Sequence, residues 1–372
     1  MMDITRKAAP ERGLFVSGSS LFARPVRLGK EKFVNNDGAK SIKLRGGPYQ
    51  FDKLELLIRT KEKIVAFVTE TDEAREWALV DGCLEDLDNI IFNLTSRYAK
   101  NIFGNLSPPL LMGVVNATPD SFYDGGEHLD VKSAIARAHS LIAAGADIID
   151  IGGESSKPGA IPVTAKEEIE RVIPVIKEVV GFGVPISIDT QKPAVMEAAV
   201  IAGASIVNDI TALSGDPRSI GLLKELGVPV ILMHMRGSPV DMQNKPYYEF
   251  APLDIFEYLR HRIMICLEAG ISKSNLIVDP GIGFGKNLDH NVAILHRLSL
   301  FHGLGVPIAI GVSRKSFIAA LSGDEPSEQR LPGSLATAIW AYNEAVQILR
   351  VHDVAETKQA LKIYKAIVDD DF

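Results

Sequence analysis

Short, nearly continuous apolar runs alternate with helical stretches along the last two thirds of the chain. A strand without alternating polar positions is buried on both faces, as in a parallel sheet that helices cover. The runs therefore predict an α/β domain with parallel strands. They are Leu110–Asn116, Asp147–Gly153, Pro185–Thr190, Ser205–Ile210, Pro229–Met235, Asn275–Gly281, Pro307–Ser313 and Gln347–Val354.

The stretches between these runs have helical period and helical punctuation. Asp130 is placed as an N-cap before a helix over Val131–Ala144, and Gly145 closes that helix. Eight strand–helix units match the size of a (β/α)₈ TIM barrel, about 250 residues. A doubly wound sheet is the alternative, but no GxGxxG follows the first strand.

The pattern is less regular before the Pro-Pro pair at 108–109, which ends helices and stiffens a linker. Ile64–Val68 reads as a short strand, and Asp72–Lys100 as one or two amphipathic helices. We therefore expect two domains. Residues 1–107 would be a small α+β extension without recognisable chemistry, and residues 108–372 the barrel.

Composition and charge narrow the class of protein. Hydrophobic residues make up 46% and charged residues 23% of the 372 residues, as in ordinary globular proteins. No apolar run approaches the roughly 18 residues of a membrane span, and the first residues lack the apolar core of a secretory signal. The net charge of −7 argues against a nucleic-acid scaffold, although residues 1–63 carry more Lys and Arg than Asp and Glu. Two cysteines cannot form a disulfide framework, so we expect a cytoplasmic protein.

Polar groups follow the apolar runs at every strand end, where the chemistry of such barrels collects. Asn116, Arg350 and His352 belong to the first and last strands, which are neighbours in a closed barrel. A guanidinium fork suits phosphate oxygens, and a neutral amide oxygen suits Mg²⁺. These residues predict an anion-binding end with Asn116 near a metal. Pairing of Arg350 with Asp353 as a structural contact is the alternative.

A second group of strand ends carries carboxylates and an amide. Asp189, Asn208 and Asp279 would converge in the barrel mouth, where burial is costly without N–H donors. A flat heterocycle with an aminopyrimidinone edge supplies such donors, and Lys315 would serve its carbonyl or a ring nitrogen. Helix capping or a salt bridge remains the alternative for each Asp taken singly.

Three glycine-containing loops, at 118–126, 154–160 and 279–286, permit tight turns and close approach to a ligand. Ser316, next to Lys315, either helps to hold a carboxylate or caps a helix.

Taken together, eight segments resemble dihydropteroate synthase in order and spacing, from about Leu110 to the C-terminus. Each segment alone is unspecific, and the combination is specific. They are LMGVVNATPDSFYDGG (111–126), DIIDIGGESSKPGA (147–160), ISIDT (186–190), VNDI (207–210), MHMRG (233–237), VDPGIGFGK (278–286), GVSRKSF (311–317) and LRVHDV (349–354).

The resemblance implies an enzyme that condenses 6-hydroxymethyl-7,8-dihydropterin diphosphate with 4-aminobenzoate. The products are 7,8-dihydropteroate and pyrophosphate. The reaction is a step of folate biosynthesis, and the enzyme is the target of sulfonamides. It further implies Mg²⁺, a homodimer, and small-molecule substrates rather than nucleic acid or membrane. The implied catalytic residues are Asp189, Lys315, Arg350, His352 and the loop residue Asp124. The implied substrate contacts are Asp150, Asn208, Met233 and Asp279 for the pterin, and Ser156, Lys157, Phe284 and Ser316 for 4-aminobenzoate, with Asn116 at the metal.

One segment departs from the family pattern. Ser155-Ser156-Lys157 stands where Ser-Thr-Arg is usual, and lysine lacks the planar fork of arginine. We therefore expect altered binding of pyrophosphate or of the second substrate by this loop, and an altered response to sulfonamides. A pterin-binding methyltransferase module and a non-catalytic paralogue are the alternatives. The SRK and RVHDV segments favour the synthase over the methyltransferase module, because only the synthase releases pyrophosphate.

Overall fold

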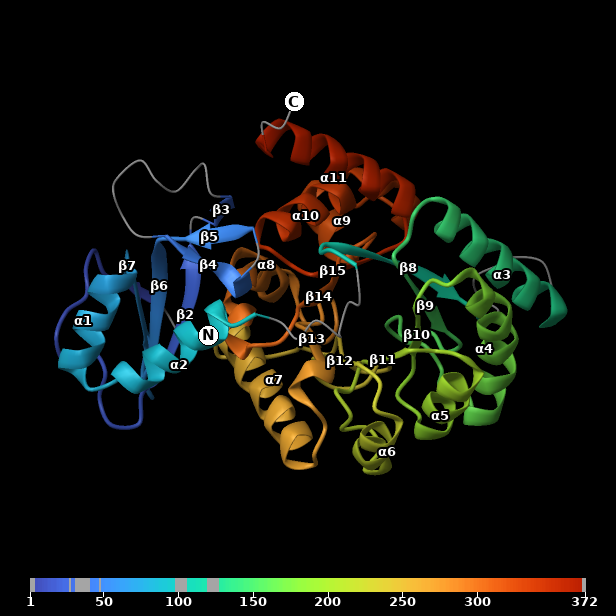
Figure 1. Ribbon diagram of the computed structural model, residues 1–372, viewed down its shortest axis with the longest axis horizontal. Helices are drawn as coiled ribbons and strands as arrows, with labels where there is room; N and C mark the ends of the chain where they lie inside the picture. Colours follow the sequence, from blue (N-terminus) through green and yellow to red (C-terminus); the bar gives the residue numbers. More distant parts are fainter. Residues whose placement is uncertain are drawn as a thin grey trace.

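The computed structural model describes residues 4–26, 28–30, 41–46, 48–97, 106–118 and 127–369 (Figure 1). The predicted barrel is present: eight parallel strands in the order β13-β12-β11-β10-β9-β8-β15-β14. A bridge between Val278 and Ile308 joins the two ends of this order and closes the ring. The strands are β8 (Leu110–Asn116), β9 (Ile148–Gly152), β10 (Ile186–Asp189), β11 (Ile206–Asp209), β12 (Val230–Met233), β13 (Leu276–Asp279), β14 (Ala309–Gly311) and β15 (Ile348–Val351).

Apolar side chains fill the inside of the barrel away from the mouth. This layer consists of Leu110, Met112, Ile148, Ile206, Ile231, Ile277, Ala309 and Ile348. The ring is therefore a packed core with a site at one end.

Helices cover the outside of the ring (Figure 1). They are α3 (Glu127–Ala143), α4 (Ala165–Val179), α5 (Pro193–Ala202), α6 (Arg218–Leu226), α7 (Ala251–Glu268), α8 (Leu288–His296), α9 (Ser316–Ser322), α10 (Leu331–Asn343) and α11 (Val354–Asp369). The prediction that Asp130 caps the first of them is wrong, because α3 begins at Glu127 and continues through residue 130. Gly145, with φ of 90°, follows its end as expected. In the part of the chain that the structure describes, no helix is long and apolar enough to cross a membrane.

The N-terminal region forms an α+β domain with a four-stranded sheet of order β1-β7-β6-β2. The expected strand at Ile64–Val68 lies within β7, and the expected helical segment is two helices. A small second sheet, β3-β5-β4, lies beside it. The elements are β1 (Ile4–Arg6), β2 (Ser20–Val26), β3 (Gly29–Lys30), β4 (Ile42–Lys43), β5 (Tyr49–Phe51), β6 (Lys53–Arg59), β7 (Ile64–Glu70), α1 (Thr71–Asp81) and α2 (Leu84–Thr95).

The four-stranded sheet is buried on both faces. One face, with Leu56, Ile58 and Phe67, packs with residues of α1 and α2. The opposite face belongs to the barrel's own hydrophobic core, and it includes Phe22 and Leu57. The domain lies beside α7 and α8 (Figure 1), and β2 runs along the 3₁₀ helix η6 (Leu298–Leu304).

Buried charges also cross this junction. Arg24 on β2 donates from Nε to Glu55 on β6, at 2.5 Å, and from Nη1 to the carbonyl of His296, at 3.2 Å. The Ser299 hydroxyl donates to the carbonyl of Pro25 at 3.0 Å. Because buried polar groups are costly without partners, these bonds fix the domain in one position on the barrel.

We predict that Phe22→Ala destabilises the whole chain. Phe22 is 1% exposed, and its ring meets Phe256 of α7 edge-on at 5.6 Å. Truncation of a buried Phe costs about 3–5 kcal/mol. Urea unfolding followed by fluorescence should show this loss as a shift of one shared transition. Phe92→Ala, at a side chain 66% exposed, is the matched control and should change stability little. A loss below about 1 kcal/mol at Phe22 would show that the two domains do not share a core.

Candidate active site at the barrel mouth

Neighbouring strands bring the predicted polar residues together at the carboxyl end of the barrel. Asp189 on β10 is paired in register with Asn208 on β11 and faces Gly152 on β9. Arg350 on β15 donates from Nε to Asp150 Oδ2 at 2.6 Å and from Nη2 to Asp189 Oδ2 at 2.7 Å. The Asn208 amide also donates to Asp150 Oδ2, at 3.4 Å. One guanidinium thus joins two carboxylates from different strands.

The proposed pairing of Arg350 with Asp353 is wrong. Asp353 instead pairs with Arg314, which donates to it from Nε at 2.9 Å and also from Nη2. The side chain of Arg350 turns across the barrel axis because two buried carboxylates there require a cation. The partners of Arg350 are therefore Asp150 and Asp189, two residues of the candidate site.

Burial dominates the electrostatics of this cluster. It raises the pKa of Asp189 to about 7, although Arg350 opposes the shift. Burial alone would lower the pKa of Arg350, but Asp150 and Asp189 raise it above the ordinary value. Asp150 has no solvent exposure, and its Oδ1 has no hydrogen-bond partner in the described part of the chain. This buried oxygen is open to a donor from a ligand.

A second cluster surrounds Lys315. Its ammonium lies 4.6 Å from the centre of the Phe284 ring and donates to the carbonyl of Ile282. Burial lowers the pKa of Lys315 to about 8, against the opposing charge of Asp279. Asp279 is itself buried, and its Oδ1 accepts the Gly281 N–H at 2.7 Å. Met233, on the neighbouring strand, is buried in register with Asp279.

A left-handed residue sets the direction of Lys315. Arg314 has φ of 58°, which is uncommon outside glycine. Its N–H donates to the Ser334 hydroxyl at 2.8 Å, and its carbonyl accepts from Arg330 at 3.0 Å. Contacts on both sides of the peptide hold this conformation, so the chain reverses directly after β14.

The residues predicted for an anion end lie at or directly after the ends of two neighbouring strands. Asn116 ends β8, which pairs with β15, the strand that carries Arg350. The Asn116 side chain is exposed and has no hydrogen-bond partner among the described residues. Burial, followed by the charge of Arg350, lowers the pKa of His352 to about 4. His352 is therefore a neutral imidazole at pH 7 and offers one N–H rather than a charge.

The predicted site residues on the described loops are more exposed than most of those on the strands. Lys157 and Ser316 are exposed, and Ser156 is half-buried. Lys315 occupies the N-cap position of α9 and Ser316 is its first helical residue, so the alternative of Ser316 as the cap is wrong. Asp124 lies outside the described residues. The predicted roles of all four residues stay predictions.

Sequence reasoning missed Lys286, although it belongs to the VDPGIGFGK segment. The residue is 3% exposed, and its Nζ lies 2.9 Å from His234 Nδ1 and donates to the Phe284 carbonyl at 2.8 Å. Burial lowers the pKa of Lys286 well below its ordinary value. It connects the end of β12 with the loop after β13. A lysine closing a glycine-rich segment was the only signal, and such a lysine is usually exposed.

Comparisons with known proteins agree with this geometry. The profile of the "Pterin binding enzyme" family matches residues 112–352. Dihydropteroate synthase of Escherichia coli K12 is 46% identical over 270 residues, which are 72% of this chain and 95% of that protein. The structure of Xanthomonas albilineans dihydropteroate synthase with 4-aminobenzoic acid is 46% identical, with a TM-score of 0.66 over 70% of this chain and 93% of that one. A Yersinia pestis dihydropteroate synthase in a sulfonamide drug complex is 45% identical, with a TM-score of 0.66 and coverages of 70% and 94%.

Removal of the Arg350 guanidinium should destabilise the fold in a pH-dependent way. In Arg350→Ala the Asp150 and Asp189 carboxylates lose their cation. Burying a carboxylate without a cation costs the most folding free energy when the carboxylate is ionised. We expect a loss of about 3 kcal/mol at pH 8 and less than half of that at pH 5, where Asp189 takes up a proton. Urea unfolding at the two pH values measures the difference. Adding Asp150→Asn should recover part of the loss, whereas equal losses at both pH values would contradict the charge balance described above.

Proposed function

The chain belongs to the dihydropteroate synthase family of pterin binding enzymes, and from this membership we propose that it condenses 6-hydroxymethyl-7,8-dihydropterin diphosphate with 4-aminobenzoate. The products are 7,8-dihydropteroate and pyrophosphate, and the enzyme is a transferase of folate biosynthesis. The observation that carries the proposal is the buried cluster in which Arg350 joins Asp150 and Asp189 beside Asn208.

This cluster suits the pterin ring, which presents amino and ring N–H donors along one edge. The Asp189 carboxylate, the free Oδ1 of Asp150 and the Asn208 amide supply acceptors for them. Asp279 and Lys315 complete the pocket, with the lysine placed for the ring carbonyl or a ring nitrogen. A flat ring that enters this mouth satisfies polar atoms that are costly to bury alone.

The diphosphate belongs at Arg350, His352 and Asn116. Arg350 uses its Nε and one Nη2 N–H for the two carboxylates, and its remaining N–H groups are available to phosphate oxygens. Asn116 fits Mg²⁺ that arrives with the diphosphate, because Mg²⁺ keeps most of its ligands as water and phosphate. No group of three or more His, Cys, Asp or Glu among the described residues could hold a metal by itself. When bound, the ion would neutralise diphosphate charge.

The second substrate would lie against Phe284 and Lys315, between the loops that carry Ser156, Lys157 and Ser316. A solved relative holds 4-aminobenzoic acid. The face of Phe284 already accepts a cation, and an aryl ring can stack there. Lys157 or Ser316 would hold the carboxylate at the exposed rim. The same place explains why a relative takes a sulfonamide drug.

In the reaction the C–O bond to the diphosphate breaks and the amine nitrogen of 4-aminobenzoate forms the new C–N bond, with loss of an amine proton. Positive charge develops on the pterin methylene and negative charge on the leaving diphosphate. Asp189 and its neighbours stabilise the first, and Arg350 with the His352 N–H stabilises the second. A cation of this kind reacts with water, so solvent must be excluded before the bond breaks.

The homodimer and the cytoplasmic location also remain proposals. The two cysteines, Cys83 and Cys266, are free and buried, which suits a reducing compartment.

The direct test of the proposed function is release of pyrophosphate from both substrates with Mg²⁺, measured by a coupled assay. We expect release that requires 4-aminobenzoate. Arg350→Ala should lower kcat at least about 100-fold, since it removes charge stabilisation at the leaving group. Arg75→Ala, which removes an exposed arginine paired with Asp88 in the N-terminal domain, is the control. Binding of a pterin without any release would point to the non-catalytic alternative.

The pH dependence of pterin binding should follow Asp189 and Lys315. The Asp189 carboxylate accepts N–H groups more strongly when it is ionised, so affinity should rise as the pH passes about 7. The Lys315 ammonium donates only when protonated, so affinity should fall again above about 8. Calorimetric titration with a pterin analogue between pH 5.5 and 9.5 should give this maximum, roughly centred between those values. Asp189→Asn should bind more weakly and lose the rising limb. An unchanged rising limb in that variant would assign it to another group.

A further inference from the structure

An arginine of the N-terminal domain contacts the barrel at the start of α7. Arg59 ends β6, where it pairs in register with Ser20 on β2 and Ile64 on β7. The turn that follows is held by Thr60, whose hydroxyl accepts the N–H groups of Glu62 and Lys63, at 3.2 and 3.1 Å. Strands on both sides and a bonded turn make this a rigid support.

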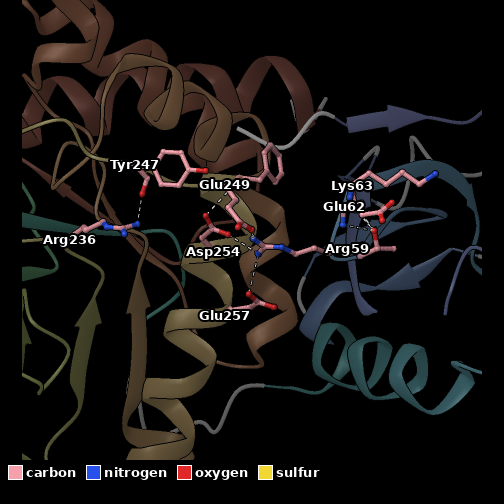
Figure 2. Close-up of polar contacts among 10 residues, drawn as sticks. Arg59, Glu62, Lys63, Arg236, Tyr247, Glu249, Asp254 and Glu257 are labelled. Carbon is pink, nitrogen blue, oxygen red and sulfur yellow. Dashed lines mark hydrogen bonds and ion pairs between the residues drawn. The ribbon is translucent and has the colours of Figure 1, made fainter. Parts of the chain in front are cut away.

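Three carboxylates of the barrel surround the Arg59 guanidinium (Figure 2). The distances from its Nη atoms are 2.5 Å to Glu249, 2.7 Å to Asp254 and 3.2 Å to Glu257. Its side chain is only 13% exposed. Asp254 also accepts the Phe250 N–H at 3.1 Å, at the start of α7. The arginine therefore fixes the point at which the β12–α7 loop (residues 234–250) enters the helix.

That loop in turn holds the β13–α8 loop (residues 280–287), which carries Phe284. Tyr248, next to Glu249, donates from its hydroxyl to the Gly285 carbonyl at 2.9 Å. Gln243 donates from Nε2 to the Gly283 carbonyl at 2.7 Å. Arg236 stacks over the Tyr248 ring, with its guanidinium carbon 5.2 Å from the ring centre. It also donates to the Tyr247 carbonyl, as Figure 2 shows. Both carbonyls flank Phe284 directly.

The two loops approach so closely that only glycine fits between them. A Cβ on Gly281 would lie 2.0 Å from the His234 carbonyl oxygen, and one on Gly285 would lie 2.3 Å from that of Arg236. Both glycines have positive φ, of 68° and 62°. A displacement of the β12–α7 loop must therefore move the β13–α8 loop as well.

The same loop supports a second edge of the mouth. The Gly159 N–H donates to the Pro239 carbonyl at 2.9 Å, which ties the Ser155–Lys157 segment to the β12–α7 loop. Both borders of the proposed 4-aminobenzoate position thus rest on one loop.

From these contacts we propose that Arg59 is a positioning residue, through which the N-terminal domain sets the geometry of the 4-aminobenzoate position. The proposal rests on the proposed function, because the altered step is binding of the second substrate. It gives the extension a role in the reaction although none of its described residues lies at the barrel mouth. Phe284 and Lys315 make the contacts, and Arg59 acts on them through Glu249 and Tyr248.

The test is steady-state kinetics of Arg59→Ala in the full chain, with pyrophosphate release as the readout. We expect KM for 4-aminobenzoate to rise about fivefold, with kcat and KM for the pterin diphosphate changed less than about twofold. Hydrogen exchange of residues 281–287 should become faster. Arg59→Lys should restore part of the effect, since an ammonium keeps the charge but cannot span three carboxylates.

Two further variants keep the result interpretable. Glu249→Gln, at a side chain 48% exposed, removes the contact nearest the loop without disturbing the sheet and should show a smaller rise of the same KM. Arg75→Ala removes an exposed ion pair with Asp88 within the same domain and should change nothing.

Two results would overturn the proposal. One is an unchanged KM for 4-aminobenzoate with unchanged exchange in residues 281–287. The other is a fall in kcat alone, because loss of folded enzyme lowers the active fraction without changing affinity. Absence of pyrophosphate release in the unaltered chain would instead refute the proposed function, and faster exchange of residues 281–287 in Arg59→Ala would still report on the loop contact.

Discussion

Charge balance in a nearly dry barrel mouth is the constraint on which the site depends. Asp150 and Asp189 are buried above an apolar core, and Arg350 is the cation that joins them. Burial raises the pKa of Asp189, and the charge of Arg350 opposes that shift. The arrangement leaves acceptor atoms on one side and guanidinium donors on the other. The same neutralisation that stabilises the mouth therefore also separates a surface for N–H donors from a surface for an anion.

The sequence was sufficient to predict the ring of strands and most residues at its mouth. Continuous apolar runs mark strands buried on both faces, and parallel order then places their ends together regardless of loop structure. Each predicted strand is present, and the structure shortens most of them by one or two residues at the ends. The start of α3 was placed too late, because Asp130 has the chemistry of a cap but lies inside the first turns of the helix.

Side-chain pairing could not be predicted in the same way. Arg350 lies three residues from Asp353 in the sequence, but Asp353 pairs with Arg314, which is 39 residues away. Arg350 instead joins two carboxylates on other strands. Lys286 was missed because its burial depends on the carbonyls of His234 and Phe284, which belong to two different loops. The contact between Arg59 and α7 joins parts of the chain that no local pattern connects.

The shared core of the two domains has a consequence for how such chains vary. Phe22 packs on Phe256, which in turn packs on Phe301, although the three belong to β2, α7 and η6. A volume change at one ring leaves a hole or an overlap at another. In relatives that carry the same extension, these distant positions should co-vary in size. The extension and the barrel would then diverge as one inherited unit, and an exchange of extensions between relatives would mismatch at this junction.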